Sequence, residues 1–143
     1  MTKELGIKEI QKLIPHRYPM LLIDRVLDLQ AGKSATAIHN VSFNEEIVQA
    51  SSDSQPVFPA PLIVEAMAQT GAVALLSQKE FEGKTAYFGG IQEAEFFDQA
   101  IPGDQMILKT ELTKIKKNIG IGVAEASIND KVIAKAELTF MIG

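Results

Sequence analysis

The sequence contains no cysteine, and it has only two histidines among its 143 residues. Without cysteine the chain can form no disulfide, no thiolate metal site and no thiol nucleophile, and the cytosol becomes the default compartment. His16 and His39 are too few for a metal site built from several histidines. Composition therefore gives no reason to expect a bound metal.

An excess of positive charge is also missing. The chain has 14 lysines and arginines against 18 aspartates and glutamates, for a net charge of −4, and its isoelectric point is near 5.2. This balance argues against nucleic acid and anionic membranes as partners.

Long uninterrupted apolar runs are lacking too. Residues 1–14 alternate charged and apolar side chains like an amphipathic helix, without the apolar stretch of a signal peptide. The longest apolar run, residues 57–76, contains two prolines, Glu65 and Gln69. It favours a buried core helix over a membrane span. With no linker or repeat, we expect a cytoplasmic protein with one domain over residues 1–143.

Apolar periodicity predicts a short N-terminal helix that ends before Pro15. Strands are expected over 20–29 and 33–42, followed by a polar, irregular segment over 44–56. Pro61 suits the first turn of a helix that runs to about Gln78. That helix is apolar on every side, so other structure must wrap it.

The remainder of the sequence predicts the strands that form this wrapper. Turn residues separate five candidate strands, at 85–90, 93–100, 105–116, 119–128 and 131–141. Strands, one long buried helix and further antiparallel strands give an α+β fold, a curved antiparallel sheet around a central helix.

Several segments in the same order resemble the FabZ-type (3R)-hydroxyacyl-[acyl-carrier-protein] dehydratases, which have a hotdog fold. These segments are IPHRYPMLLIDRV at 14–26, NVSFNE at 40–45, PVFPAPLIVEAMAQTGAVA at 56–74, YFGGIQEAEF at 87–96 and IPGDQM at 101–106. The resemblance implies a lyase of fatty-acid biosynthesis that acts on acyl thioesters. It also implies a homodimer or trimer of dimers, and no cofactor.

In that family a histidine from one subunit's loop and a glutamate from the other subunit's helix form the catalytic pair. Glu65 falls on the glutamate, as the acid, and Ser51 falls on the histidine. A serine hydroxyl is a very weak base without an imidazole beside it. The loop glycines have changed as well, to Ala60 among others, and Pro61 beside it has no N–H to donate.

Other positions carry a role only by the resemblance. Gln69 lies one turn beyond Glu65, where it would orient the site or bond across the dimer. Asp53 is a loop carboxylate or a simple Asx turn. The resemblance implies that the substrate is bound by Gln69, Phe58, Pro59, Ala60, Phe88, Gly89 and Phe96, of which the phenylalanines suit either core or tunnel lining.

The surface for a carrier protein departs from the family. Residues 95–98 are acidic where positive charge would help to dock an acidic carrier protein. Lys114, Lys116 and Lys117 form a basic cluster on a hairpin, which is either a phosphate or carrier contact or a solvated turn.

Four functions remain open from the sequence. The first is dehydration of a 3-hydroxyacyl thioester. The second is a heterodimer in which Glu65 completes the site of a histidine-bearing homologue. The third is a thioesterase in which Glu65 or Asp53 activates water, and the fourth is a non-catalytic module that binds acyl thioesters or lipids.

Overall fold

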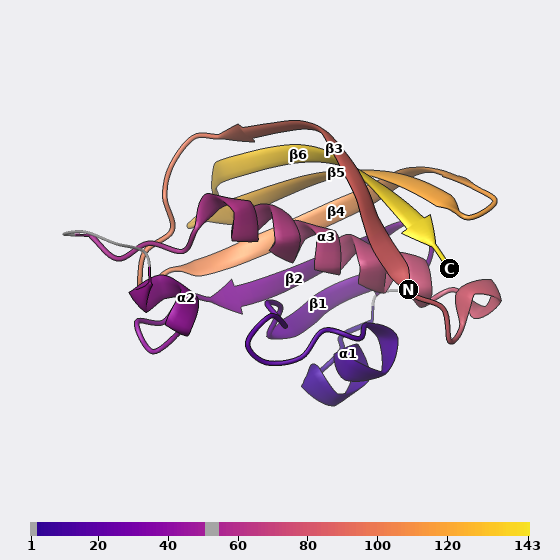
Figure 1. The fold of residues 1–143 in the computed structure, drawn as a ribbon, viewed down its shortest axis with the longest axis horizontal. Helices are drawn as coiled ribbons and strands as arrows, with labels where there is room; N and C mark the ends of the chain where they lie inside the picture. The colour runs from indigo at the N-terminus through magenta and orange to yellow at the C-terminus, as the bar shows by residue number, and fades with distance from the viewer. Residues whose placement is uncertain (1–2, 51–54) are drawn as a thin grey trace.

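The computed structural model describes residues 3–50 and 55–143, so Ser51 and Asp53 lie outside the described residues. Its elements appear in Figure 1. In chain order they are α1 (Ile7–Leu13), β1 (Arg25–Gln30), β2 (Ser34–Asn40), α2 (Glu46–Gln49), α3 (Ala60–Leu76), the 3₁₀ turn η1 (Lys79–Phe81), β3 (Ala86–Phe96), β4 (Gln105–Lys116), β5 (Ile119–Ile128) and β6 (Lys131–Ile142).

The six strands form one sheet in the order β1-β2-β4-β5-β6-β3, and every neighbouring pair is antiparallel. The sheet curves around α3, which lies along its inner face, while α1 lies beside the β1 end (Figure 1). The predicted α+β architecture, a curved antiparallel sheet around one long helix, is confirmed.

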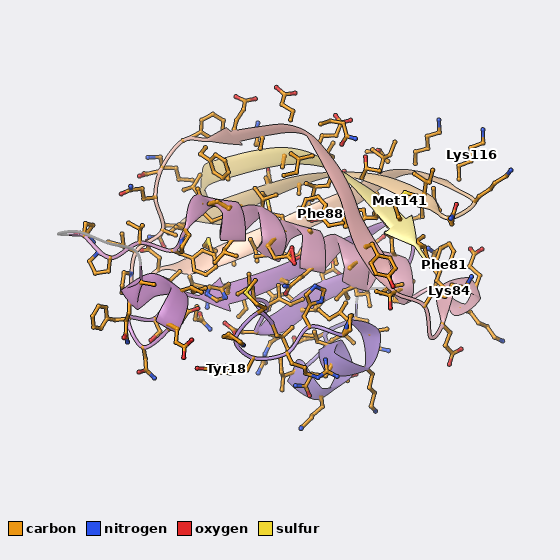
Figure 2. The ribbon with its side chains drawn as sticks, viewed as in Figure 1. Tyr18, Phe81, Lys84, Phe88, Lys116 and Met141 are labelled. Carbon is orange, nitrogen blue, oxygen red and sulfur yellow. The ribbon has the colours of Figure 1, made fainter. Side chains whose placement is uncertain are left out.

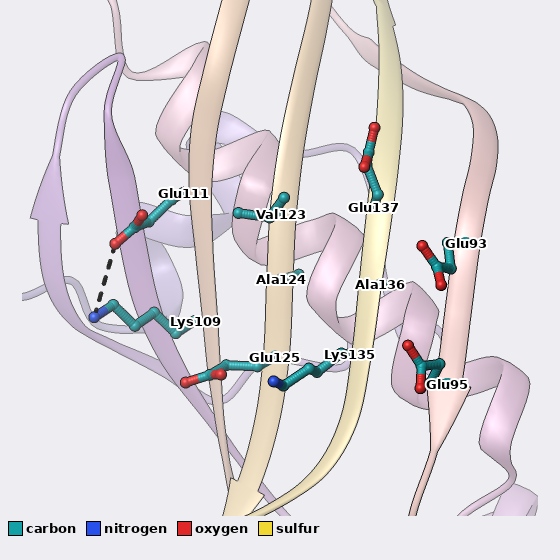
Figure 3. A pocket seen from close by; sticks show the side chains of 10 residues that line it. All are labelled: Glu93, Glu95, Lys109, Glu111, Val123, Ala124, Glu125, Lys135, Ala136 and Glu137. Atoms are coloured by element: carbon teal, nitrogen blue, oxygen red, sulfur yellow. Dashed lines mark ion pairs between the residues drawn. The ribbon is translucent and has the colours of Figure 1, made fainter.

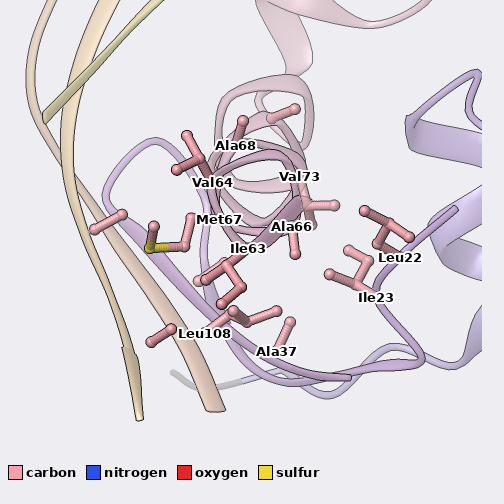
Figure 4. Close-up of a cluster of buried hydrophobic side chains, with 14 of the residues drawn as sticks. Leu22, Ile23, Ala37, Ile63, Val64, Ala66, Met67, Ala68, Val73 and Leu108 are labelled. Carbon is pink, nitrogen blue, oxygen red and sulfur yellow. The ribbon is translucent and has the colours of Figure 1, made fainter. Parts of the chain in front are cut away.

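Side chains from both sides enclose α3. Every residue from Ala66 to Leu76 is buried, as expected of a helix with no polar face. Figure 4 looks along the helix and shows Leu22 and Ile23 on one side, with Ala37 and Leu108 of the sheet on another. Among the described residues, no helix is long and apolar enough to cross a membrane.

The close approach of α3 to the sheet depends on Gly71. A Cβ placed on Gly71 would lie 2.7 Å from a ring carbon of Phe140 and 3.0 Å from the methyl group of Thr110. Thr110 in turn donates a hydrogen bond of 2.9 Å from its hydroxyl to the carbonyl of Met67. The helix and the sheet are therefore in direct contact at this point, and only glycine fits there.

The boundaries of four predicted elements were wrong. The strands expected at 85–90 and 93–100 are one strand, β3, because Gly89-Gly90 continues the pairing with β6 through a bulge and makes no turn. Residues 20–24 precede β1 and do not belong to it. The segment expected to be irregular contains the short helix α2.

Replacing Gly71 with alanine should destabilise the fold by about 1–3 kcal/mol, because the added methyl group must displace a packed phenylalanine ring. Urea denaturation followed by circular dichroism measures the change. Gly90→Ala is the matched control, since a Cβ there meets nothing within 4 Å. Equal stability of the two variants would contradict the account of the contact between α3 and the sheet.

Candidate active site

Glu65 lies in the second turn of α3. Pro59 is the N-cap of this helix and Pro61 lies in its first turn, so the chain enters the helix with fixed φ angles and loses no useful N–H. The Glu65 side chain is 24% exposed, whereas the residues that follow it on the helix are buried. It is therefore a carboxylate at the border between the core and the surface.

The side chain that forms the ion-pair contact with Glu65 comes from the segment after α1. His16 Nε2 lies 3.4 Å from Glu65 Oε1, and the His16 side chain is 26% exposed. The other ring nitrogen, Nδ1, is buried and has no hydrogen-bond partner among the described residues. His16 is not among the site residues predicted from the sequence, and the structure brings it beside Glu65.

Hydrogen bonds from the Arg17 side chain to backbone carbonyls hold the turn that carries His16. The Arg17 guanidinium donates to the carbonyl oxygens of Ile14 at 2.9 Å, His16 at 2.7 Å and Gln11 at 2.9 Å. Ile14 is buried in the core. The turn is therefore fixed at its first residues, at the carbonyls of Ile14 and His16.

Gln69 holds the other end of the same turn. Its side chain is almost fully buried, accepts a hydrogen bond of 2.9 Å from the Leu22 N–H and donates one of 2.7 Å to the Met20 carbonyl. The same Nε2 lies 3.5 Å from Glu65 Oε1, which is long for a hydrogen bond. Gln69 thus ties the turn to α3 on the side of the helix where Glu65 lies.

His39, the second histidine, belongs to the scaffold. It is buried, its Nδ1 contacts the Leu22 carbonyl at 2.5 Å, and its Nε2 lies 3.1 Å from the Glu45 carboxylate. Its ring also packs against Phe58, with centroids 4.6 Å apart. Both ring nitrogens are therefore occupied by partners that connect the turn, β2 and the segment before α2.

The remaining predicted site residues lie in two places. Phe58, Pro59 and Ala60 lead into α3, and Phe58 is a core residue whose N–H donates to the Ala100 carbonyl at 2.8 Å. Phe88, Gly89 and Phe96 lie on β3, where both phenylalanines are exposed. Phe88 is labelled in Figure 2. No described hydrogen bond links these β3 residues to Glu65.

The lysine cluster lies at the hairpin between β4 and β5, where Figure 2 labels Lys116. Lys114, Lys116 and Lys117 line a surface cavity of about 350 Å³ together with Asn118, Ile119 and Ile121. Apolar side chains between cations give this hairpin both charge and contact area.

A second cavity, of about 410 Å³, lies on the face of the sheet opposite α3 (Figure 3). Five glutamates and two lysines line it, and Lys109 pairs with Glu111 at 3.9 Å. Asp98 follows β3 by two residues, and its pKa is lowered mainly by the hydrogen bond from the Gln99 N–H and further by Lys131. This outer face is acidic and separated from Glu65 by the sheet.

Comparisons with known proteins find similar sequences over nearly the whole chain. The sequence model described as a FabA-like domain matches residues 14–137. The chain is 52% identical over 143 residues to the 3-hydroxyacyl-[acyl-carrier-protein] dehydratase FabZ of Clostridium botulinum strain Loch Maree, covering 100% of this chain and 99% of the relative. It is 57% identical over 139 residues to FabZ of Ligilactobacillus salivarius, covering 97% and 99%.

Solved structures share the fold at low sequence identity. The dehydratase heterocomplex ApeI:P from Xenorhabdus doucetiae has a TM-score of 0.78 at 18% identity, over 94% of this chain and 90% of that one. The conserved protein PA5202 from Pseudomonas aeruginosa has a TM-score of 0.72 at 16% identity, over 93% and 98%. These likenesses confirm the hotdog fold.

Replacing Gln69 with leucine should lower the free energy of unfolding by about 2–3 kcal/mol, because a buried N–H and a carbonyl lose their partners. Hydrogen exchange should show reduced protection of the Leu22 amide. Gln105→Ala removes an exposed amide paired with Asn40 and should change stability by less than about 0.5 kcal/mol. An unchanged Leu22 amide in Gln69→Leu would show that Gln69 does not hold the turn.

Proposed function

The chain belongs to the FabZ family of 3-hydroxyacyl-[acyl-carrier-protein] dehydratases, and from this premise we propose that it interconverts 3-hydroxyacyl and enoyl thioesters in fatty-acid biosynthesis. The observation that carries the proposal is Glu65, a partly exposed carboxylate at the position of the family's catalytic acid, beside an imidazole. A reaction that takes a proton from C2 of the substrate and gives a proton to the leaving hydroxyl group needs such a side chain.

Dehydration breaks the C2–H bond beside the thioester carbonyl and the C3–O bond of the hydroxyl group. The hydroxyl leaves as water only if it receives a proton, and a carboxyl group can supply one. Glu65 is the group proposed for this step, and Gln69 holds the segment beside it in place. Of the two positions that form the family's catalytic pair, the one occupied by Glu65 lies within the described residues.

The loop on the other side of the family's active site has changed. Ser51 stands at the histidine position, and it lies outside the described residues. Because a lone serine hydroxyl is a very weak base, the proposed reaction depends on Glu65 more heavily than the family's histidine–glutamate mechanism does.

A second copy of the chain is part of the proposal. The strand β3 is the last strand of the sheet, so it has an unpaired edge. It exposes large apolar side chains, Tyr87, Phe88, Ile91 and Phe96. An apolar, unpaired edge favours association through β3, and a dimer or a trimer of dimers would then place the substrate-binding residues Phe88, Gly89 and Phe96 at the interface. We place this assembly in the cytoplasm.

The carrier protein is proposed to dock at Lys114, Lys116 and Lys117. Carrier proteins are acidic, and the outer face of the sheet, with five glutamates and two lysines around its cavity, would repel them. The β4–β5 hairpin presents three lysines beside a cavity of about 350 Å³ instead.

Incubation of the purified protein with a 3-hydroxyacyl-carrier-protein thioester should yield the enoyl product, detected by mass spectrometry as loss of water. Glu65→Gln should lower kcat by about 100-fold or more, because the amide cannot exchange a proton. Glu80→Gln, at an exposed glutamate of η1, is the control and should match the unchanged protein.

Three other outcomes would overturn this reading. Release of free thiol without enoyl product would indicate a thioesterase. Conversion only after mixing with a histidine-bearing FabZ would indicate shared sites in a heterodimer. Saturable binding with no conversion in either case would indicate a binding module.

Reversing the charge of Lys114, Lys116 and Lys117 to glutamate should weaken the binding of the carrier protein by about tenfold or more at low salt, with a smaller effect at high salt. Isothermal titration with an acylated carrier protein measures this without requiring turnover. Lys8→Glu with Lys12→Glu, at exposed positions of α1, is the control. Equal affinity of both variants for the carrier protein would remove the hairpin from the docking surface.

A further inference from the structure

The proposed reaction needs a base as well as an acid, and this chain has serine where the family has the basic histidine. The described residues contain one imidazole at Glu65, that of His16, at 3.4 Å. His39 does not supply the missing group, because both of its ring nitrogens are engaged by the Leu22 carbonyl and Glu45.

The position of His16 is built into the fold. Arg17 donates to the carbonyl oxygens of Ile14 and His16, and Gln69 binds the backbone at Met20 and Leu22. Both ends of the turn are fixed, and one of the two anchors is a residue of the helix that carries Glu65. The approach of His16 to Glu65 therefore does not depend on a flexible side chain alone.

The burial of the ring decides which nitrogen carries the proton. His16 Nδ1 is buried without a partner among the described residues, and a buried N–H without an acceptor costs more than a lone pair there. The proton therefore belongs on Nε2, which faces the Glu65 carboxylate. In this tautomer His16 is a donor to Glu65 and does not itself take a proton from the substrate.

Two side-chain nitrogens lie nearest to the same oxygen of Glu65. His16 Nε2 lies 3.4 Å and Gln69 Nε2 lies 3.5 Å from Oε1. Glu65 Oε2 makes no hydrogen bond to any described residue. Both nitrogens lie nearest to Oε1, which leaves Oε2 as the oxygen that meets a substrate.

We propose that His16 holds Glu65 as an oriented carboxylate whose Oε2 acts as the base and then as the acid of the dehydration. The proposal rests on the proposed function, and it reverses the role that the family resemblance gives to Glu65. It removes the need for a histidine at position 51.

In the proposed reaction Glu65 is the only side chain that takes and returns a proton. Oε2 takes the proton from C2, and the electron pair of the C2–H bond moves to the thioester as an enolate. When the electrons return, the C2=C3 double bond forms and the C3–O bond breaks, and Oε2 gives the same proton to the leaving oxygen. Water departs and Glu65 is again a carboxylate, with no other reactant consumed.

Because His16 acts through Glu65, it is a positioning residue, and nitrogen NMR tests the contact without any turnover. At about pH 8, above the usual titration range of histidine, long-range proton–nitrogen correlations should show the His16 proton on Nε2. Glu65→Gln should shift the His16 nitrogen signals and leave those of His39 unchanged. A proton on Nδ1, or His16 nitrogen signals that are unchanged in Glu65→Gln, would overturn the proposal. With only two histidines in the chain, assignment needs a single variant.

Kinetics of two His16 variants test the role in catalysis. His16→Leu should lower kcat by about 100-fold with KM changed by less than about twofold, as expected when a preorganised donor is removed. His16→Gln, whose amide can donate from near the position of Nε2, should restore most of that loss. Lys12→Gln, exposed on α1, is the control, and thermal unfolding confirms that each variant is folded.

The two proposals fail in different ways. If the unchanged protein converts no 3-hydroxyacyl thioester, the proposed function and the role of Glu65 as base are both wrong. The NMR result still decides whether His16 holds Glu65. If the protein converts its substrate and His16→Leu matches it in kcat, only the role of His16 is wrong.

Discussion

The enclosure of α3 is the constraint on which the rest of the structure depends. The sheet covers one side of the helix and the turn after α1 covers another, so polar groups along it must be satisfied by the protein. Thr70 donates to the Ala66 carbonyl within the helix, and Thr110 reaches across from β4 to the carbonyl of Met67. Gln69 is satisfied by the backbone of the turn. Glu65, near the open end of the helix, is the polar side chain that keeps access to solvent.

Much of the fold was predictable because local and global signals agreed. Pro61 and the mostly apolar sequence after it predicted a buried helix. β4 and β5 are each followed by turn residues with positive φ angles, Lys117 after β4 and Asn129 and Asp130 after β5. Gly89-Gly90 misled the prediction because glycine permits a turn without requiring one. There the pairing with β6 overrides the local signal, and the strand continues through a bulge.

The candidate site was only half predictable. Glu65 and Gln69 follow from the spacing of one helical turn and from the family resemblance. His16 is brought to them by the long-range hydrogen bonds of Gln69 with the backbone at Met20 and Leu22, together with local hydrogen bonds of Arg17. The family resemblance placed the partner of Glu65 at position 51, where this chain has serine. The available signal was the turn itself, a histidine between two prolines in PHRYP, since such a rigid turn can place a side chain reproducibly. Which residue it would face could not be deduced from that signal.

The start of α3 shows how the changed loop and the retained helix fit together. An enolate at the thioester needs hydrogen-bond donors, and Pro61 offers none. The N–H groups of Leu62 and Ile63 are already directed at the Pro59 carbonyl, so the Ala60 N–H is the one left unbonded among the described residues at this end of the helix. The helix dipole favours negative charge at this end of the helix. The acidic group and the remaining donor thus belong to the same rigid helix, which explains how the helix can keep its part of the site while the loop before it changes.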